Sequence, residues 1–213
     1  MKNLSLPDFL RISLRRKSMG QKVSFPDFHG SFQVAMIGLD NAGKSTVLYR
    51  LKMGQYVSTV PTVGFNCEKI KATSGPAKGS SFMIWDVGGQ EKLRPLWRSY
   101  VRQTDIVLMV VDSSKPERFQ EAKVELSNLM RTSDVPPCVP VLLLANKQDL
   151  PSALTEDKIA EEMGLTGLNP SHPTDYLKCC AITGEGLGEI FDIMHELIAK
   201  SRKFDKNKKK SIR

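Results

Sequence analysis

A glycine-rich segment carries the first residues whose types and spacing indicate chemistry. Residues 38–45 read Gly-Leu-Asp-Asn-Ala-Gly-Lys-Ser and match the pattern G-x-x-x-x-G-K-[ST]. Glycines let the backbone turn with its N–H groups aimed inward, and the helix that follows adds positive potential at its N-terminus. We expect Lys44 to reach the β- and γ-phosphates of a nucleotide, and the Ser45 hydroxyl to ligate Mg²⁺. The predicted phosphate cradle consists of Gly38, Asp40, Asn41, Ala42, Gly43, Lys44, Ser45 and Thr46.

An Asn-Lys-Gln-Asp block at 146–149 predicts which base is bound. An aspartate accepts hydrogen bonds from N1 and the exocyclic amine of guanine, and adenine lacks this donor pair, so Asp149 should select guanine. We expect Asn146 to tie the loop to the cradle and the Lys147 stem to cover the base. A second loop at 180–183 would offer the Ala181 N–H to the base oxygen. Each loop alone is also consistent with an ordinary turn, but the cradle upstream favours a nucleotide.

Two more segments have residues suited to the terminal phosphate. In 85–90, which reads Trp-Asp-Val-Gly-Gly-Gln, Asp86 would hold Mg²⁺ through water, the Gly89 N–H would sense the γ-phosphate and Gln90 would orient the attacking water. Upstream, Thr62 would close on Mg²⁺ with its hydroxyl and backbone. Catalysis would then fall to Gln90, Lys44 and Thr62. Because no arginine is an evident finger in cis, hydrolysis should be slow, and a partner's arginine would speed it by about 10³–10⁵-fold.

The elements that must position these residues alternate between strand and helix patterns. Continuous apolar runs at Ile106–Asp112 and 139–145 are typical of strands buried on both faces of a parallel sheet. Further strands are predicted at 33–38, 64–71 and 81–86, with a hairpin connection at 71–80, and helices at 46–51, 116–132 and 187–203. In the last helix one apolar face is expected, made up of Ile190, Met194, Leu197 and Ile198. We therefore predict an α/β fold of the P-loop NTPase type, with a doubly wound, mostly parallel six-stranded sheet that has one antiparallel strand.

Charge is distributed unevenly along the 213 residues, whose formal net charge is +8. Residues 1–18 hold five basic residues and one acidic residue, and residues 200–213 hold eight and one, so the middle is slightly acidic. Basic ends on such a body favour an anionic membrane surface or an import receptor over nucleic acid. No run of 18 apolar residues predicts a membrane-spanning helix. The four cysteines match no zinc spacing, so we expect reduced, buried thiols.

Taken together, these blocks resemble the ADP-ribosylation factor (Arf) family over about residues 33–200. The resemblance rests on 38–46, on Val-Pro-Thr-Val-Gly-Phe-Asn at 60–66, and on 85–90 running into Glu-Lys-Leu-Arg-Pro-Leu-Trp at 91–97. The hairpin connection and the lysine-rich end are most similar to the fourth Arf-like subgroup, which has a basic C-terminal extension. Ser45 stands where the family usually has threonine, which is chemically equivalent.

The resemblance implies a small GTPase that switches between GTP and GDP states with Mg²⁺. It also implies an aromatic triad of Phe65, Trp85 and Tyr100 that contacts exchange factors and effectors, although the three rings would also pack the core. The 71–80 hairpin would slide in register and expel an N-terminal segment from a pocket. Implied partners are an exchange factor, a GTPase-activating protein and effectors, which include exchange factors for other Arf proteins. We expect a cytoplasmic monomer that binds membranes reversibly, at the plasma membrane, with the nucleus as a second location.

The two ends leave alternatives open. Residues 19–24 read Met-Gly-Gln-Lys-Val-Ser and fit the myristoylation pattern at Gly20, but 18 residues precede them. Either translation starts at Met19 and Gly20 is acylated, or Met1 is the start and Gly20 is internal and unmodified; we favour the second alternative. Residues 1–18 fit a disordered arm, a surface helix or a transit segment.

We divide the chain into an arm (1–32), a GTP-binding domain (33–199) and a basic tail (200–213). The tail fits a solvated helix end, a lipid-binding segment or, at Lys208-Lys209-Lys210, an import signal.

Two other functions remain as alternatives. One is a scaffold that binds GTP and rarely hydrolyses it, against which Gln90 and Thr62 argue. The other is an ATP-dependent P-loop enzyme such as a small kinase, against which Asp149 argues.

Overall fold

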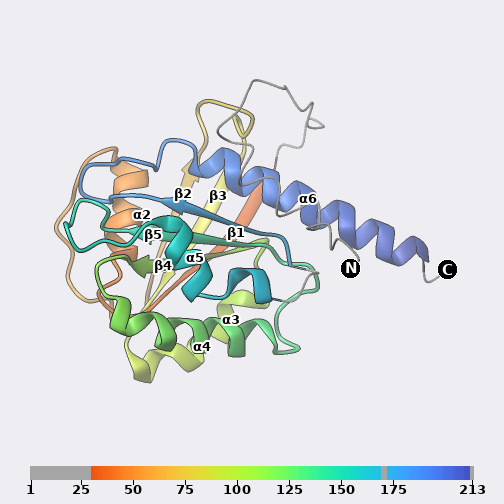
Figure 1. Cartoon of the computed structure of the whole chain (residues 1–213). Coiled ribbons are helices and arrows are strands. Elements are labelled where there is room, and N and C mark those ends of the chain that lie inside the picture. Colours follow the sequence, from red (N-terminus) through yellow and green to blue (C-terminus); the bar gives the residue numbers. More distant parts are fainter. Residues whose placement is uncertain (1–29, 169–171, 212–213) are drawn as a thin grey trace, which may run out of the picture.

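A six-stranded sheet in the order β2-β3-β1-β4-β5-β6 forms the centre of the molecule (Figure 1). The structure is a computed structural model, and it describes residues 30–168 and 172–211. The strands are β1 (Ser31–Ile37), β2 (Phe65–Lys71), β3 (Ser81–Val87), β4 (Ile106–Asp112), β5 (Val141–Asn146) and β6 (Thr174–Lys178). β2 is antiparallel to β3, and the other neighbouring pairs are parallel. The predicted fold class is therefore confirmed.

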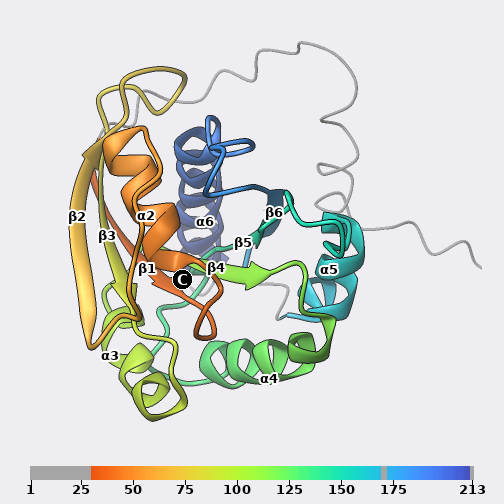
Figure 2. The ribbon, with the colours of Figure 1, turned by 90° about the vertical axis from the view of Figure 1, so that its left-hand side faces the viewer.

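Helices cover both faces of the sheet (Figure 2). The α-helices are α2 (Lys44–Met53), α3 (Trp97–Val101), α4 (Phe119–Met130), α5 (Glu156–Glu162) and α6 (Ile190–Ser211), and the 3₁₀ helices are η1 (Glu91–Leu96), η2 (Pro116–Arg118) and η3 (Leu165–Gly167). α2 and α6 lie on one face, and α3, α4 and α5 lie on the other. Strand order reverses at β1, which puts a ligand crevice at the carboxyl ends of β1 and its neighbours.

The central strands are buried on both faces, as their continuous apolar runs predicted. In β4, Leu108 and Val110 belong to the core under α2 and α6, while Val107 and Met109 belong to the core over α3 and α4. Successive side chains of a strand point to opposite faces, so an uninterrupted apolar run fills both cores. This double burial holds the strand ends, and the loops that follow them, in fixed positions.

The observed boundaries differ from the predicted ones in a few places. α2 begins at Lys44 directly after a left-handed Gly43 and ends at Met53, so it extends beyond the predicted helical segment 46–51 at both ends. The predicted helix at 116–132 is divided into η2 and α4. The segment predicted as a strand at 139–145 pairs only from Val141 to Asn146.

α6 is longer than predicted, and it changes our view of the basic tail. Its predicted apolar face is confirmed, because Ile190, Met194, Leu197 and Ile198 are all buried. The helix continues to Ser211, so most of the basic segment is helical, and its far end projects beyond the body in Figure 1. Lysine and arginine are good helix formers and need no tertiary partner to extend a helix. The predicted domain boundaries at 32/33 and 199/200 fall inside β1 and α6.

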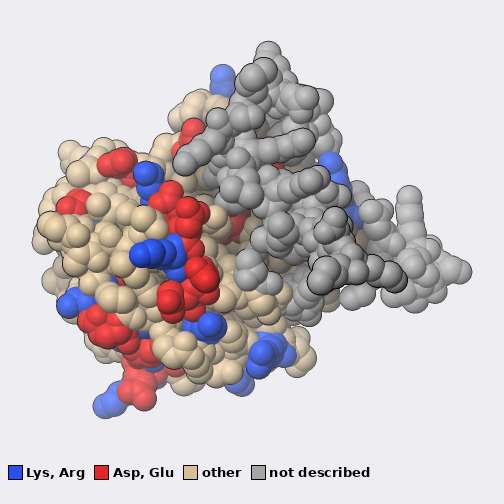
Figure 3. Space-filling view, in the orientation of Figure 1, with Lys and Arg blue, Asp and Glu red and all other residues tan. Residues whose placement is uncertain are grey.

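Charges of both signs are interspersed over the face of the body shown in Figure 3, and no continuous basic surface appears there. None of the helices in the described ranges has the length and apolar character needed to cross a bilayer.

Candidate functional site

The loop between β1 and α2 has the backbone conformation that a phosphate cradle needs. Gly38, Asn41 and Gly43 have φ angles of 145°, 59° and 89°. A Cβ atom on Gly38 would lie 2.2 Å from Val110 O, and one on Gly43 would lie 2.4 Å from Asn146 Nδ2. Glycine is therefore required at both positions, for conformation and for close approach to β4 and β5. A turn with such positive φ angles can bring successive N–H groups to one side, as in known anion-binding loops.

The Lys44 ammonium lies inside this loop. Its Nζ donates to Gly38 O at 2.9 Å and to Leu39 O at 3.0 Å, and the side chain is buried. Burial disfavours the charged form and lowers the pKa of Lys44 to about 8, although Asp86 and Asp40 oppose the shift. A phosphate beside this amine would favour its charged form, so the lysine is suited to bind an anion.

Ser45, Thr62 and Asp86 form an oxygen-rich group next to Lys44. Ser45 Oγ donates to Asp86 Oδ2 at 2.5 Å, and it lies 2.7 Å from Thr62 Oγ1. Asn66 Nδ2 also donates to Asp86 Oδ2, at 2.9 Å. Asp86 Oδ1 is buried and has no hydrogen-bond partner among the described residues. An unpaired buried carboxylate oxygen is unfavourable unless a cation or its water is close, and Mg²⁺ prefers such oxygen ligands, so the residues fit this ion.

The two predicted switch segments meet the cradle at one cleft. A Cβ atom on Gly89 would lie 2.4 Å from Gly38 O and 2.5 Å from Asp40 N, so Gly89 lies directly against the loop. The cleft has a volume of about 270 Å³. Its lining combines the cradle with both switch segments: Asp40, Asn41, Gly43, Lys44, Ser45, Thr46, Thr59, Val60, Pro61, Thr62, Gly89 and Gln90. Gln90 is exposed at its edge, just before η1.

Asn146 joins the predicted base loop to the cradle. Its Nδ2 donates to Ala42 O at 2.9 Å, and its Oδ1 accepts from Ala181 N at 3.0 Å. The Ala181 N–H, which we expected to face the base oxygen, is therefore used by the protein itself. The contact of this N–H with the base oxygen stays a prediction, and the described structure shows that buried Asn146 already shares the N–H. Ala181 still belongs to the site, as the link between two loops.

Lys147 and Asp149 flank the same loop. Lys147 has a φ of 66°, and its Nζ lies 2.7 Å from Asp112 Oδ2. Burial alone would raise the pKa of Asp112, but the hydrogen bonds from Lys147 and Ser114 and the charge of Lys147 together outweigh it, and the pKa is lowered. The Cys180 thiol donates to Asp149 Oδ1 at 3.1 Å. These contacts fix both side chains beside the loop of Ala181.

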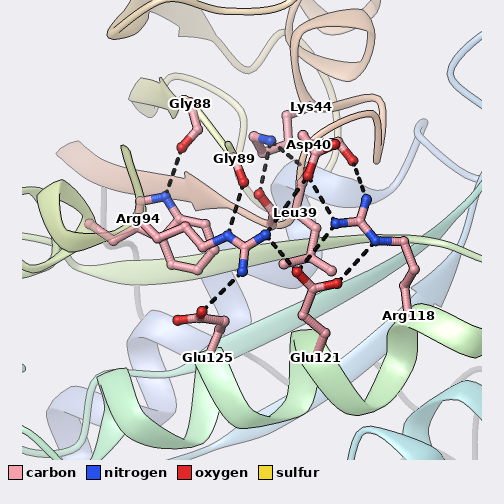
Figure 4. Close-up of polar contacts among 11 residues, drawn as sticks. Leu39, Asp40, Lys44, Gly88, Gly89, Arg94, Arg118, Glu121 and Glu125 are labelled. Carbon is pink, nitrogen blue, oxygen red and sulfur yellow. Dashed lines mark hydrogen bonds and ion pairs between the residues drawn. The ribbon is translucent and has the colours of Figure 1, made fainter. Parts of the chain in front are cut away.

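A network of ion pairs, absent from our sequence analysis, connects the cradle to α4 and to the second switch (Figure 4). Arg118 donates to Asp40 Oδ1 at 2.9 Å and to Asp40 O at 3.1 Å. Its hydrogen bond lowers the pKa of Asp40 and contributes most to the lowered pKa of Glu121. Buried Arg94 donates to Glu121 at 2.7 Å and to Glu125 at 3.0 Å. The only sequence signal was the helical spacing of Arg118, Glu121 and Glu125, which is common on exposed helices.

The aromatic triad is assembled as a cluster. Phe65, Trp85 and Tyr100 have ring centroids 5.5, 5.6 and 5.9 Å apart. Trp85 and Tyr100 pack against the core, whereas half of Phe65 is exposed. The rings therefore pack together and partly against the core, as expected, whereas their contact with exchange factors and effectors stays a prediction.

The cysteines are free, and three of the four are buried. Burial raises the pKa of Cys179 to about 12, which keeps this thiol protonated. Within the described ranges no cluster of His, Cys, Asp and Glu has the makeup of a metal centre. Gly20 and the N-terminal alternatives lie outside the described residues, as do the side chains of 206–213.

Known proteins match most of the chain. The sequence model of the ADP-ribosylation factor family matches residues 21–198. ADP-ribosylation factor-like protein 4C from Homo sapiens is 51% identical, over 84% of this chain and 93% of that protein. Protein 4A from Mus musculus is 50% identical over 88% and 92%, and human protein 4D is 46% identical over the same shares. The Trypanosoma brucei Arl6 BBS3 small GTPase, solved with the analogue GppNp, has a TM-score of 0.70 and 32% identity, covering 80% of this chain and 99% of its own.

Proposed function

Since the chain belongs to the ADP-ribosylation factor family, and is a GTP hydrolase that binds guanine nucleotide, we propose that it acts as a slow switch whose shape depends on the γ-phosphate. One observation carries this proposal: Thr62 of the first switch and Gly89 of the second both meet the cradle. The Thr62 hydroxyl lies 2.7 Å from Ser45, and Gly89 packs against the 38–40 backbone. Loss of the γ-phosphate would remove the ligand that these two loops share.

Lys44, Ser45, Thr62 and Gln90 of the cleft, and Asp86 beside it, have chemical tasks in this proposal. Mg²⁺, when bound, neutralises charge on the phosphates. Ser45 and Thr62 would hold the ion through their hydroxyls, and Asp86 through water. Lys44 would hold the β- and γ-phosphates, and Gln90 would orient the attacking water from the edge of the cleft.

Slow hydrolysis follows from the pairing of the nearby arginines. Arg118 and Arg94 contact the cradle and Gly89, but both are ion-paired with carboxylates of α4. A guanidinium that is already paired is poorly suited to stabilise charge on a transferring phosphate. An arginine from an activating protein would therefore supply the missing charge, with an acceleration of about 10³–10⁵-fold.

Single-turnover hydrolysis and nucleotide competition test the proposal. We expect GTP and GDP, but not ATP, to displace a fluorescent guanine nucleotide. Hydrolysis by the isolated protein should proceed at roughly 10⁻⁴–10⁻² s⁻¹. A rate of about 1 s⁻¹ would contradict the slow-switch proposal. Binding with no turnover, even with an activating protein, would favour the alternative of a GTP-locked scaffold.

A groove of about 700 Å³ supports a role for the N-terminal arm in switching. It runs between α2, the 71–80 hairpin and the start of α6, and Ala77 N at the hairpin tip donates to Asp192 Oδ1 at 2.8 Å. We suggest that the arm occupies this groove in the GDP state and leaves when the hairpin shifts. Amide hydrogen exchange in the hairpin and early α6 should then differ between the GDP and GTP-analogue forms, and identical exchange would reject the idea.

Membrane attachment through α6 is the second part of the proposal. Basic residues recur along the projecting end of the helix, and Phe204 there is 54% exposed. Each Lys or Arg close to an anionic surface contributes about 1 kcal/mol. We therefore propose reversible binding of a cytoplasmic protein to anionic lipid at the plasma membrane, strengthened if Gly20 is acylated. Replacing Lys208, Lys209 and Lys210 by Gln should weaken binding to phosphatidylserine vesicles, and unchanged binding would reject this role. Nuclear import through the same lysines would be lost in parallel.

Partner proteins would bind at the aromatic triad and so recognise the nucleotide state. Half-exposed Phe65 lies beside Val63, which is 89% exposed, on the segment that also carries Thr62. An exchange factor, an activating protein and effectors in membrane traffic or actin signalling, including exchange factors for other Arf proteins, are the partner classes that we propose. A Phe65→Ala variant should bind nucleotide normally and lose effector binding.

A further inference from the structure

Two carbonyl groups of the second switch are held by side chains from the segment just downstream. Trp97 Nε1 donates to Gly88 O at 3.0 Å. Arg94 Nε donates to Gly89 O at 3.1 Å (Figure 4). Trp97 and Arg94 are both buried, so bulk water does not compete for these hydrogen bonds. Trp97 has no role in the proposed function, and Arg94 enters it only as a guanidinium that is already paired.

Because a peptide is planar, each of these two contacts also fixes the direction of the N–H group in the same peptide. In a planar trans peptide the C=O and N–H groups point in opposite directions. Gly88 O and the Gly89 N–H share one peptide, so the Trp97 indole turns that N–H away from itself. Gly89 O and the Gln90 N–H share the next peptide, which Arg94 orients in the same way. Since Gly89 lies against the cradle backbone, the orientation of its N–H is set where a γ-phosphate would bind.

The guanidinium of Arg94 is itself anchored at its other two nitrogens. Nη1 donates to Glu125 Oε1 at 3.0 Å and Nη2 to Glu121 Oε1 at 2.7 Å. Burial lowers the pKa of Arg94, but the two carboxylates outweigh this effect, and the net shift is upward. A planar guanidinium with acceptors on three sides can donate to all three in only one orientation. Arg94 therefore fixes the position of Gly89 relative to α4.

The same carboxylates tie α4 to the cradle. Glu121 accepts from Arg118 at 3.1 Å, and Arg118 holds the side chain and the carbonyl of Asp40. The cluster of Asp40, Arg94, Arg118, Glu121 and Glu125 contains two positive and three negative groups. The net charge of this cluster is negative, so the cluster would not attract an anion. The cluster is suited to hold two backbone segments at a fixed separation instead.

We propose that Arg94 is a positioning residue for γ-phosphate sensing: with Trp97 it aims the Gly89 peptide at the cleft, and through Glu121 and Arg118 it fixes that peptide relative to the cradle. This inference deepens the proposed function and rests on it. A pre-oriented donor loses little freedom when the ligand arrives, so the cluster strengthens binding of GTP and not of GDP. GDP has no γ-phosphate for the Gly89 N–H to contact.

The first test compares an Arg94→Gln variant with a matched Arg98→Gln control. Arg98 lies one helical turn further on and is exposed. Equilibrium affinities for GDP and for a non-hydrolysable GTP analogue are measured with Mg²⁺. Loss of hydrogen bonds to a charged group should lower the analogue affinity by roughly 10–100-fold for Arg94→Gln, with GDP affinity unchanged within about twofold. Arg98→Gln should behave as the wild type.

An Arg94→Lys variant separates positioning from simple charge. Lysine keeps the charge but cannot reach three acceptors in one plane, so most of the loss in analogue affinity should persist. Full rescue by lysine would overturn the inference. The ³¹P resonance of the γ-phosphate should shift in both Arg94 variants, while the α- and β-phosphate resonances stay in place.

An equal loss of GDP and analogue affinity in Arg94→Gln would mean a structural role, and an unchanged affinity ratio would mean no role; both overturn the inference. If Arg94→Gln does not fold, Glu125→Gln replaces it, because that change keeps the guanidinium and removes one anchor. It should lower the analogue affinity selectively, by a smaller factor. Failure of the wild type to bind guanine nucleotide would instead reject the proposed function, so the two failures are distinguishable.

Discussion

The guanine end and the phosphate end of the cleft are built from different interactions. At the guanine end, the buried amide of Asn146 joins Ala42 and Ala181 through neutral hydrogen bonds at the end of a fully buried strand. At the phosphate end, hydroxyls and ion pairs connect segments that include highly exposed residues such as Val60 and Val63. The guanine end is thus anchored in the buried core through Asn146, whereas the phosphate end can be held or released by what it binds.

The largest effect should come from breaking the guanine end. Asp149→Asn removes the carboxylate that distinguishes guanine, so GTP and GDP affinity should both fall by roughly 10³-fold or more. Xanthosine triphosphate, whose 2-oxo group can accept from the new amide, should bind better than GTP. The measurement is competition with a fluorescent nucleotide. A loss of affinity confined to GTP would show that the guanine end also senses the phosphates. That result would contradict the division between the two ends of the cleft.

Gln90→Leu acts only at the phosphate end. Removal of the group that orients water should slow single-turnover hydrolysis by about 10²-fold and leave GTP and GDP affinity nearly unchanged. Gln103→Leu, at an exposed position in the same region of the chain, is the control. Equal rates in Gln90→Leu and wild type would remove Gln90 from the mechanism.

Ser45→Asn sharpens the comparison, because it should lower the affinity for a GTP analogue more than the affinity for GDP. Ser45 contacts both Asp86 and Thr62, so a larger amide there would disturb the Mg²⁺ ligands. Affinity for a GTP analogue should fall roughly 30-fold in Mg²⁺ buffer, more than for GDP, and the difference should vanish in EDTA. Exposed Ser99→Asn serves as the control. A loss that is the same with and without Mg²⁺ would count against this role of Ser45.

The smallest effect is a pH dependence caused by Lys44. Burial lowers the pKa of Lys44 to about 8, and phosphates should raise it, so nucleotide binding above pH 8 should take up a proton. Affinity should therefore fall as pH rises, by about fourfold between pH 7 and 8.5. Isothermal titration in two buffers of different ionisation enthalpy measures the proton uptake. Lys44→Arg, which stays charged, should lose this dependence, and a rise in affinity with pH would contradict the assignment.

Much of the site could be predicted because its motifs are contiguous. The cradle, the base loop and the second switch each occupy a few successive residues after a buried strand, where backbone N–H groups and short side chains act locally. β6 and α5 were not located in the sequence analysis. Thr174–Lys178 is an edge strand of intermediate burial, so it lacks the apolar run that identified β4 and β5.

The partners of Arg94 could not be predicted. Glu121 and Glu125 lie 27 and 31 residues away in sequence, and Asp40 lies 78 residues from Arg118. Many Arg and Glu residues on helices have suitable spacing, and most of them form exposed pairs of little consequence. Burial of one guanidinium among these carboxylates arises only when η1, α4 and the cradle come together.

The Ala181 N–H illustrates the same division at the guanine end. The sequence placed Ala181 in a base loop, but Asn146 Oδ1 accepts its N–H, a contact between residues 35 positions apart. By itself the sequence determined the fold class, the family and the nucleotide chemistry, because local backbone geometry and strand burial follow from short segments. The tertiary structure decided which polar groups pair across the cleft, because a buried donor must take whichever acceptor the packed strands and helices bring within reach.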